Sequence, residues 1–389
     1  MKRIFILFIF IVLPASLYCQ PGQAAEVFLI TCGPGTETYS IYGHSALRIT
    51  DATTDIVYNW GVFDFSTPHF AWKFAKGRLN YLLDTERFNN FLQEYIYEKR
   101  WVLSQKINLD EDETDTLRYL ISENLKPENM EYRYDFFYDD CSTRIRDILE
   151  KSIGKKLFYP PDDKKTRFSF RDKINEYQRP YPWLNMGIDL LIGTPGDKTA
   201  GFRDRMFLPL EMQKELSQAL VNREGKMIPL LQNPVNVLDY SSPKVRQHFF
   251  ASPLFVFTAA FIILMLFFAL IRKRKINNIM DIIIFLIFSL LAILMIFFNF
   301  FTDHEQLRKN LNIIWLNPFL FLCLTSLILN KDWHIWFRIV FFLSLLAFVI
   351  QILFPHAFNN AFIPLLMILM LRSSSRAGFS WNPLSVESI

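Results

Sequence analysis

The chain has 389 residues, which is enough for two domains of ordinary size. Hydrophobic residues make up 51% of it and charged residues 21%, a mixture typical of a soluble part joined to a membrane part. The net charge of +4 is too small to indicate a nucleic-acid surface, and the sequence has neither zinc-type Cys/His spacing nor a glycine-rich phosphate loop. We therefore expect no nucleic-acid partner, no metal and no diffusible cofactor.

The first 24 residues have the pattern of an export signal. Lys2 and Arg3 supply a basic start, and residues 4–13 form an apolar run that is too short to cross a bilayer comfortably. We expect cleavage between Ser16 and Ala25. A retained N-terminal anchor is the alternative.

Residues 25–251 mix polar and apolar positions with frequent turn signals, as exported globular domains do. Alternating or β-branched patterns predict strands, and 3.6-residue periodicity predicts helices. The expected strands are 27–31, 45–50 and 56–65, and the expected helices are 87–97, 111–124 and 141–152. This arrangement predicts an α+β domain.

Residues 252–389 predict a membrane domain of about five transmembrane helices. The apolar runs are 254–271, 282–301, 313–329, 333–354 and a short fifth at 361–371. The basic run 272–275 belongs in the cytoplasm by the positive-inside rule, which places the N-terminal domain on the outer side of the membrane. We therefore expect a multi-pass protein of the bacterial cytoplasmic membrane with a periplasmic N-terminal domain.

Two residues of the N-terminal domain suggest thiol chemistry. Cys141 opens a predicted helix, where the helix dipole and free N–H groups favour a thiolate. His44, directly before a predicted strand, can take the thiol proton and return it. A third polar residue would orient the imidazole, and the next strand offers Asn59, Tyr58 and Asp64, with Asn59 as the first choice.

The simpler alternatives stay open on these residues alone. Cys32 and Cys141 could form a disulfide in an oxidising compartment. The two acidic residues before Cys141 oppose a lowered thiol pKa and could serve only as helix caps.

The order of histidine, strands, helices and cysteine resembles the circularly permuted papain-like fold of the lecithin retinol acyltransferase relatives. More closely, the chain resembles the Lnb family of lipoprotein N-acyltransferases. The stretches that carry this resemblance are YSIYGHSALRI (39–49), YNWGVFDF (58–65), KGRLNYLL (76–83), YDDCSTR (138–144), GTPGDK (193–198), MFLP (206–209) and NLNIIWLNP (310–318). One departure is Asp140, because the family pattern leads us to expect Asn directly before the cysteine.

The resemblance implies a papain-like exported domain followed by an all-α transmembrane bundle. It also implies acyl transfer, through a thioester on Cys141, to the α-amino group of a lipoprotein whose N-terminal cysteine carries a diacylglyceryl group. The acyl chain is expected from the sn-2 position of that lipid, and a membrane phospholipid donor is an alternative. Catalysis is assigned to His44, Cys141 and Asn59.

Five further residues are expected to contact the substrate: Tyr42, Arg48, Asp64, Arg144 and His304. The two arginines could hold a phosphate, and the histidine lies in a short loop on the outer side of the membrane. Two other functions remain open. One is a papain-like cell-wall peptidase or amidase, for which five spans would serve no purpose. The other is a non-catalytic membrane assembly protein with a Cys32–Cys141 disulfide.

Overall fold

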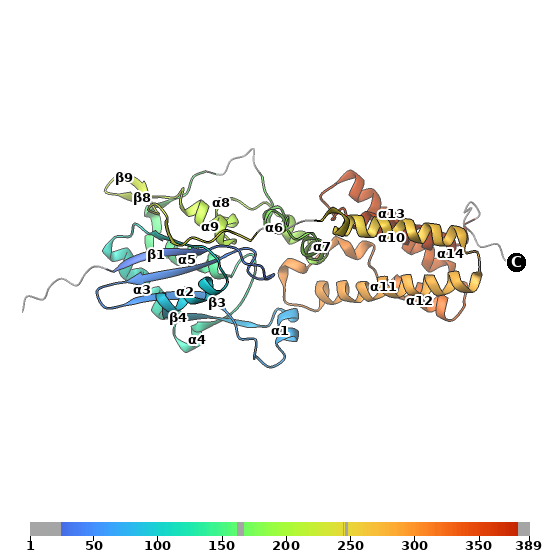
Figure 1. Cartoon of the computed structure of the whole chain (residues 1–389), viewed down its shortest axis with the longest axis horizontal. Coiled ribbons are helices and arrows are strands. Elements are labelled where there is room, and N and C mark those ends of the chain that lie inside the picture. Colours follow the sequence, from blue (N-terminus) through green and yellow to red (C-terminus); the bar gives the residue numbers. More distant parts are fainter. Residues whose placement is uncertain (1–24, 162–166, 244, 246–247, 380–389) are drawn as a thin grey trace, which may run out of the picture.

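The computed structural model of the chain describes residues 25–161, 167–243, 245 and 248–379 (Figure 1). The predicted export signal lies outside the described residues. The described chain forms a sheet-rich N-terminal domain followed by a helical part, and the two lie end to end along the long axis. The predicted division into α+β and all-α parts is therefore present.

The N-terminal domain is built on a seven-stranded antiparallel sheet in the order β10-β5-β1-β2-β3-β4-β6. Its strands are β1 (Glu26–Cys32), β2 (His44–Thr50), β3 (Asp55–Val62), β4 (Asn80–Arg87), β5 (Val102–Lys106), β6 (Glu131–Arg133) and β10 (Val235–Leu238). The first three confirm the predicted strands, but β3 ends earlier than expected. The reason is that Gly61 interrupts its pairing with β4 and Asp64 begins a turn by accepting the N–H of Ser66.

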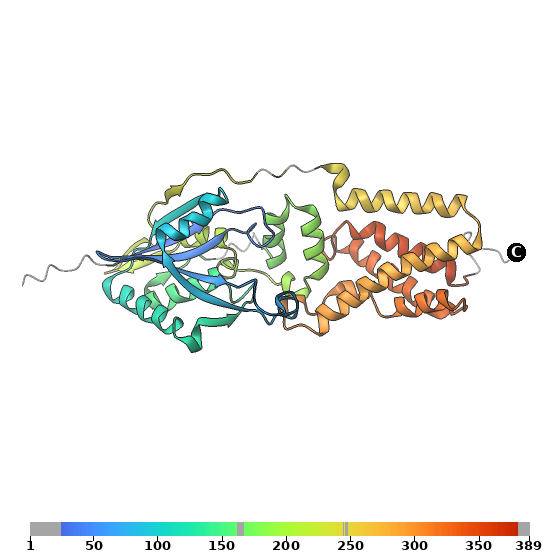
Figure 2. The ribbon, with the colours of Figure 1, turned by 60° about the horizontal axis from the view of Figure 1, so that its bottom comes forward.

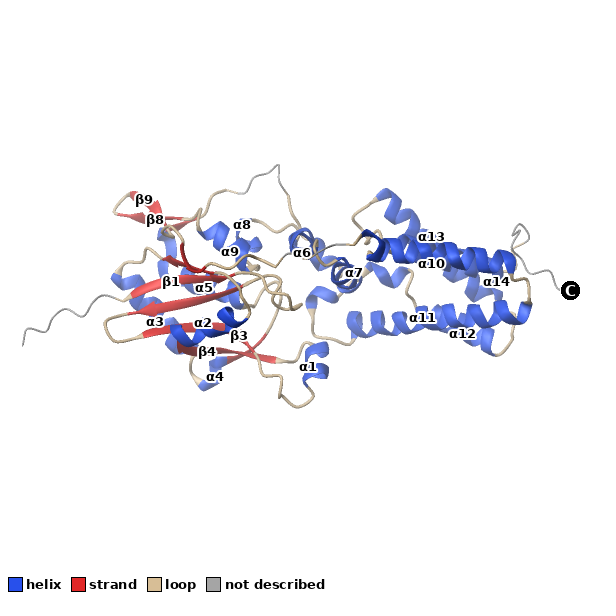
Figure 3. Ribbon diagram, in the orientation of Figure 1, coloured by secondary structure: helices blue, strands red, loops and turns tan. Residues whose placement is uncertain are grey.

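Helices cover both faces of this sheet (Figure 3). One face packs a cluster that includes Ile30, Ala46 and Val57 against α2 (Phe88–Tyr97). The other face packs a larger apolar cluster against α3 (Glu111–Asn124), α5 (Cys141–Ile153) and α9 (Pro209–Leu216). These ranges confirm the three predicted helices. The apolar periodicity predicted them because each helix places its apolar residues on the side that faces the sheet.

Shorter elements complete the domain. The helices are α1 (Phe70–Lys76), α4 (Pro127–Met130), α6 (Phe170–Gln178), α7 (Pro182–Leu191) and α8 (Phe202–Arg205), with 3-10 turns at Gly154–Lys156 and Thr194–Asp197. A second, three-stranded sheet joins β7 (Leu157–Phe158), β8 (Leu220–Arg223) and β9 (Lys226–Pro229). In the figures α1, α6 and α7 lie at the end of the domain that faces the helical part.

The helical part contains α10 (Pro253–Leu270), α11 (Arg274–Phe300), α12 (Phe319–Ile328), α13 (His334–Leu353) and α14 (Phe362–Arg376). Among the described residues, four segments are long and apolar enough to cross a membrane: α10, α11, α13, and the stretch Leu311–Ile328 that contains α12. The fifth predicted span corresponds to α14, which has only 15 residues. Asn317 and Pro318 separate a 3-10 turn (Leu311–Ile314) from α12, so the third predicted span is interrupted.

A buried ion cluster joins α11 to α14 inside this bundle. Asp281 is fully buried and accepts hydrogen bonds from Arg372 Nε at 2.7 Å and Nη2 at 2.9 Å. Arg376 Nε donates to the same carboxylate at 2.7 Å. The guanidinium of Arg372 also lies 3.5 Å from the ring centre of Phe268 on α10. One carboxylate therefore ties together three helices among apolar neighbours.

The N-terminal domain is attached to the bundle through the loop after α11, which includes the 3-10 turn Glu305–Leu307. Arg78 Nε donates to Asp303 at 2.7 Å, and the N–H of Gly193 donates to the carbonyl of Gln306 at 2.8 Å. Asn310 donates to the carbonyls that end α7. Figure 2 shows this loop between the sheet domain and the Phe300 end of α11. The turn from α10 to α11, which carries the basic run, lies at the other end of the bundle, away from the sheet domain.

We predict that Asp281→Ala destabilises the protein by about 3–5 kcal/mol, because it leaves the buried Arg372 and the half-buried Arg376 without their partner. Thermal unfolding of the detergent-solubilised protein measures this change. Asp332→Ala is the matched control, since this carboxylate is exposed near the same end of the bundle and should change stability by less than about 0.5 kcal/mol. Equal effects of the two substitutions would show that the ion cluster carries no stability.

Candidate active site

Cys141 is the first residue of α5, and its position is fixed by a capping box. The Asp140 carboxylate accepts the backbone N–H of Thr143 at 2.8 Å, and the Thr143 hydroxyl accepts the N–H of Asp140 at 2.7 Å. Behind the cap, Ile145 and Leu149 are fully buried against the sheet. Local capping and apolar packing together hold the start of α5 in one place.

The Cys141 thiol is buried among hydrogen-bond donors. The backbone N–H groups of Ser45, Ser142 and Cys141 itself are directed at the sulfur, and the Ser142 hydroxyl lies 3.8 Å from it. Burial raises the pKa of the thiol above its ordinary value of 9.0, and these donors offset part of that rise because they favour the thiolate. The thiol therefore needs a base to become a nucleophile near neutral pH.

The sulfur occupies a place where two strands of the sheet separate. Pairing between β2 and β3 ends at Leu47 and Tyr58, so Ser45 has no partner on β3 and its N–H is free for the thiol. On the β3 side Gly61 has a φ of +90°, and a Cβ there would lie 3.6 Å from Cys141 Cβ. Only glycine adopts this conformation without strain, so β3 passes the start of α5 with no side chain at this position.

His44 begins β2, and Asn59 on β3 holds its ring. Asn59 Oδ1 lies 2.6 Å from His44 Nε2. Because an amide oxygen can only accept, Nε2 carries the proton and Nδ1 keeps a free lone pair. Burial lowers the pKa of His44 below 6.5, more than its hydrogen bond to Asn59 raises it. The imidazole is therefore neutral near pH 7 and able to accept a proton.

The structure brings the histidine and the cysteine to the same end of the sheet without a direct bond between them. Within the described residues no hydrogen bond joins His44 to the Cys141 thiol; the thiol meets the N–H of Ser45, the next residue along the chain. Alternation along the strands places His44 with Ala46 on the α2 face, whereas α5 packs on the opposite face. The thiol therefore lies beside the residue that follows His44, and the imidazole lies on the opposite face of the sheet.

Cys32 is not bonded to Cys141. Both thiols are free and buried, and Cys32 shares a hydrogen bond with the Tyr95 side chain. Burial raises the pKa of the Cys32 thiol to about 12. The disulfide considered from the sequence is therefore absent from this structure, and Cys32 is a buried core residue opposite His44 in the β1–β2 pair.

Tyr132 is a neighbour of Cys141 that the sequence did not single out. Its hydroxyl is 3.9 Å from where a Cβ on Gly61 would lie, as Cys141 Cβ is 3.6 Å from that point, and it is buried without a hydrogen-bond partner among the described residues. Burial, and then the charge of a Cys141 thiolate, raise its pKa, so it keeps its proton. The residue lies on a three-residue strand, which gave no signal in the sequence.

The five expected substrate contacts are spread over the molecule. Tyr42 accepts a 2.6 Å hydrogen bond from Gln178, and Arg48 pairs with Asp55 while lying over the rings of Phe28 and Phe88. Asp64 caps an exposed turn.

Arg144 pairs with Asp139 and stacks on the Tyr132 ring, so it lies nearest to Cys141. His304 Nε2 donates to the carbonyl of Phe74 at 2.9 Å, at the junction with the bundle.

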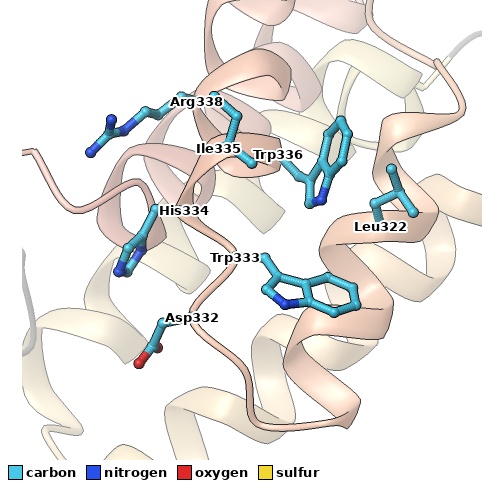
Figure 4. A pocket seen from close by; sticks show the side chains of 7 residues that line it. All are labelled: Leu322, Asp332, Trp333, His334, Ile335, Trp336 and Arg338. Carbon is cyan, nitrogen blue, oxygen red and sulfur yellow. The ribbon is translucent and has the colours of Figure 1, made fainter.

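A hollow between α12 and α13 lies away from this site, in the helical part (Figure 4). It is lined by Leu322, Asp332, Trp333, His334, Ile335, Trp336 and Arg338. His334 Nδ1 is already bonded to the carbonyl of Arg376. Tryptophans that flank a transmembrane helix are typical of the membrane–water interface, and we assign no chemistry to this hollow.

Asp140, where the family pattern predicts Asn, keeps the cap that an asparagine would make. It is 2% exposed, and burial followed by the charge of a Cys141 thiolate raises its pKa well above 3.8. A carboxylic acid that keeps its proton is neutral, as an amide is, and its second oxygen still accepts the N–H of Thr143. Asp140 therefore need not place a full negative charge beside the thiol.

We predict that Asp140→Asn stabilises the protein relative to wild type increasingly as the pH rises from about 4 to 7. Between 3.8 and the higher folded pKa, the folded wild type holds a proton that the unfolded chain has released, so its stability falls with rising pH. The amide does not titrate and its cap remains. Thermal midpoints measured across this range test the prediction. A loss of stability in the variant that is the same at every pH would contradict it.

Two family models match the chain, in chain order. The model described as the Lnb N-terminal periplasmic domain matches residues 20–166, and the one described as the Lnb transmembrane domain matches residues 244–380. No curated protein and no solved structure matches the chain. The first match contains His44, Asn59, Tyr132 and Cys141, and the second contains α10 to α14. The chain therefore belongs to the Lnb family of membrane proteins, with a periplasmic N-terminal domain and a transmembrane domain.

Proposed function

We propose that the protein is a lipoprotein N-acyltransferase. The observation that carries this proposal is a buried thiol at a helix start, surrounded by N–H donors, at the end of the sheet where a neutral histidine is held by an asparagine. The family match and the attached membrane bundle favour a substrate that lies in a membrane. The proposed acceptor is the α-amino group of a diacylated lipoprotein. The acyl chain comes from its sn-2 ester, or from a membrane phospholipid.

The reaction divides into two acyl transfers. In the first, His44 Nδ1 takes the Cys141 proton, and the thiolate attacks the ester carbonyl. The ester C–O bond then breaks, the glyceryl oxygen takes the proton back from His44, and a thioester remains on Cys141. In the second, the lipoprotein amine attacks the thioester and gives up a proton through His44. The amide forms, and the thiol is restored.

Each transfer passes through a negatively charged oxygen that needs hydrogen-bond donors. The backbone N–H groups at the start of α5 are available for this purpose, because the thioester carbonyl forms next to them. Tyr132 is the proposed side-chain donor, since its protonated hydroxyl has no hydrogen-bond partner among the described residues and lies close to Gly61, as Cys141 does. We infer that the imidazole and the thiol come into direct contact when substrate binds, as apo sites commonly tighten on binding.

The proposed location is the outer face of the bacterial cytoplasmic membrane. The basic run 272–275 and the N-terminal domain lie at opposite ends of the bundle, which suits a cytoplasmic run and a periplasmic domain. We also propose the permuted papain-like fold. Its basis is the order along the chain of the elements that carry His44, Asn59 and Cys141. The non-catalytic alternative loses its basis, since it depends on a disulfide that this structure does not contain.

We predict that Cys141→Ala abolishes N-acylation while leaving the protein folded and inserted.

His44→Ala should lower kcat/KM by roughly 10²–10⁴-fold, the range of general acid–base catalysis. Asn59→Ala should lower kcat/KM less, because Asn59 only orients the ring. Wild-type kcat/KM should hold as the pH is lowered to 6.5 and fall only at lower pH, because His44 must be neutral and burial lowers its pKa below 6.5. Mass spectrometry of lipoprotein N-termini measures the product.

The thioester is the decisive intermediate of this scheme. With the amine acceptor withheld, a hydroxylamine-sensitive acyl adduct should accumulate on Cys141. Cys32→Ser is the matched control for thiol loss, because that thiol is equally buried but has no proposed role, and it should still form the adduct. Wild-type acylation by Cys141→Ala, or an adduct on another residue, would disprove the mechanism.

We predict that Tyr132→Phe lowers kcat by about 10²–10³-fold, the cost of removing one oxyanion donor, with a small change in KM. The ring and its packing remain, so the thermal midpoint should stay close to that of the wild type. Single-turnover formation of the Cys141 adduct separates this step from substrate binding. An unchanged rate of adduct formation would exclude the hydroxyl as a donor.

A further inference from the structure

Helix α1 and the loop before it expose aromatic side chains that the fold does not cover. Helix α1 has the sequence FAWKFAK and contains no buried residue. Trp72 is 59% exposed and Phe74 53% exposed, and Phe65 in the preceding loop is 67% exposed. Three large aromatic side chains within ten residues form a patch that water solvates poorly, and such patches mark interaction sites.

This segment is fixed at the outer end of a transmembrane helix. The Trp72 ring centre lies 5.6 Å from that of Phe297 in the last turn of α11. Lys76 donates to the carbonyl of Phe301, and its own carbonyl accepts the N–H of Asp303 at 2.9 Å. These contacts place α1 beside the point where α11 leaves the apolar part of the bilayer. Tryptophan and lysine are the residues that commonly occupy this level of a membrane.

Aromatic rings continue from this patch toward the thiol. Phe65 lies 5.0 Å from Phe70 and 4.9 Å from Phe63, measured between ring centres, and Phe63 lies 5.2 Å from Tyr81. The Tyr81 ring is 6.5 Å from that of Tyr132, and the Tyr132 hydroxyl and Cys141 both lie next to Gly61. A nearly continuous row of rings thus joins the exposed patch to the candidate active site.

We propose that residues 63–76 enter the outer leaflet of the bilayer and that the row of aromatic rings leads the acyl chain of a membrane lipid to Cys141. The bilayer is the occupant that fits, because the patch is continuous with the exposed apolar end of α11 and carries lysines rather than carboxylates within its helix. The path to Cys141 rests on the proposed acyl transfer. Entry into the leaflet does not.

Photocrosslinking of the full chain tests entry into the leaflet. Benzoylphenylalanine is placed at position 72 or 74, and the protein is reconstituted in nanodiscs of phosphatidylethanolamine and phosphatidylglycerol. Illumination should add the mass of one phospholipid at either position. Positions 97 and 119 are matched controls, since Tyr97 is 89% and Tyr119 61% exposed and they lie on α2 and α3, away from the bundle; they should not react with lipid. No lipid adduct at 72 and 74, or crosslinks to protein instead, would overturn the proposal.

A kinetic comparison tests the acyl path. Acyl transfer from a bilayer-embedded lipoprotein is compared with adduct formation from a short-chain water-soluble ester. The double variant Trp72→Ser, Phe74→Ser should lower the ratio of the two kcat/KM values by an order of magnitude or more, because two apolar side chains no longer anchor the segment. Tyr97→Ser with Tyr119→Ser should leave the ratio as in the wild type. An unchanged ratio in the first variant would overturn the path.

The two experiments separate this proposal from the proposed function. If lipid adducts form at 72 and 74 but Cys141→Ala still acylates, the segment enters the bilayer and the thiol mechanism is wrong. If Cys141→Ala is inactive but no lipid adduct forms, the mechanism stands and entry into the leaflet is wrong.

Discussion

The proposed chemistry depends on the place where β2 and β3 stop pairing. Beyond Leu47 and Tyr58 the two strands no longer share ladder hydrogen bonds, and the N–H of Ser45 on β2 interacts instead with the thiol of Cys141, the first residue of α5. The loss of pairing would normally leave a backbone N–H unsatisfied, and here the thiol is its partner. His44, the residue before Ser45, is held on the other face of the sheet by Asn59.

The sequence predicted the local structure because local patterns determine it. Alternation and apolar periodicity located the strands and helices of the sheet domain. Asn59 was the first choice among three polar residues of the next strand, and the structure places its side chain at the His44 ring. The features it missed depend on pairing between distant residues. Tyr132 reaches the site from a three-residue strand, and Gly61 acts through a break in pairing with β4.

The junction between the two parts could not be predicted for the same reason. The contacts of Asp303, Gln306 and Asn310 are single polar interactions with residues more than a hundred positions away, and no periodic pattern marks them. Asp281 differs, because a carboxylate near the start of an apolar run is itself a signal for a buried partner. Its two arginine partners, however, follow only from the packing of α11 against α14.

The electrostatics of the site imply an order of events. Burial keeps the Cys141 thiol protonated and His44 neutral, and Asp140 also tends to stay protonated, so the resting site carries little charge. A neutral, buried site suits an apolar acyl chain better than an ion pair would, because no charge loses its solvation when the chain arrives. In the proposed reaction, charge then appears only as the thiol transfers its proton, when an ester carbonyl is present to receive the thiolate. The proposed order therefore has the acyl chain reach the thiol first, so the route of that chain from the bilayer is a step of the proposed mechanism.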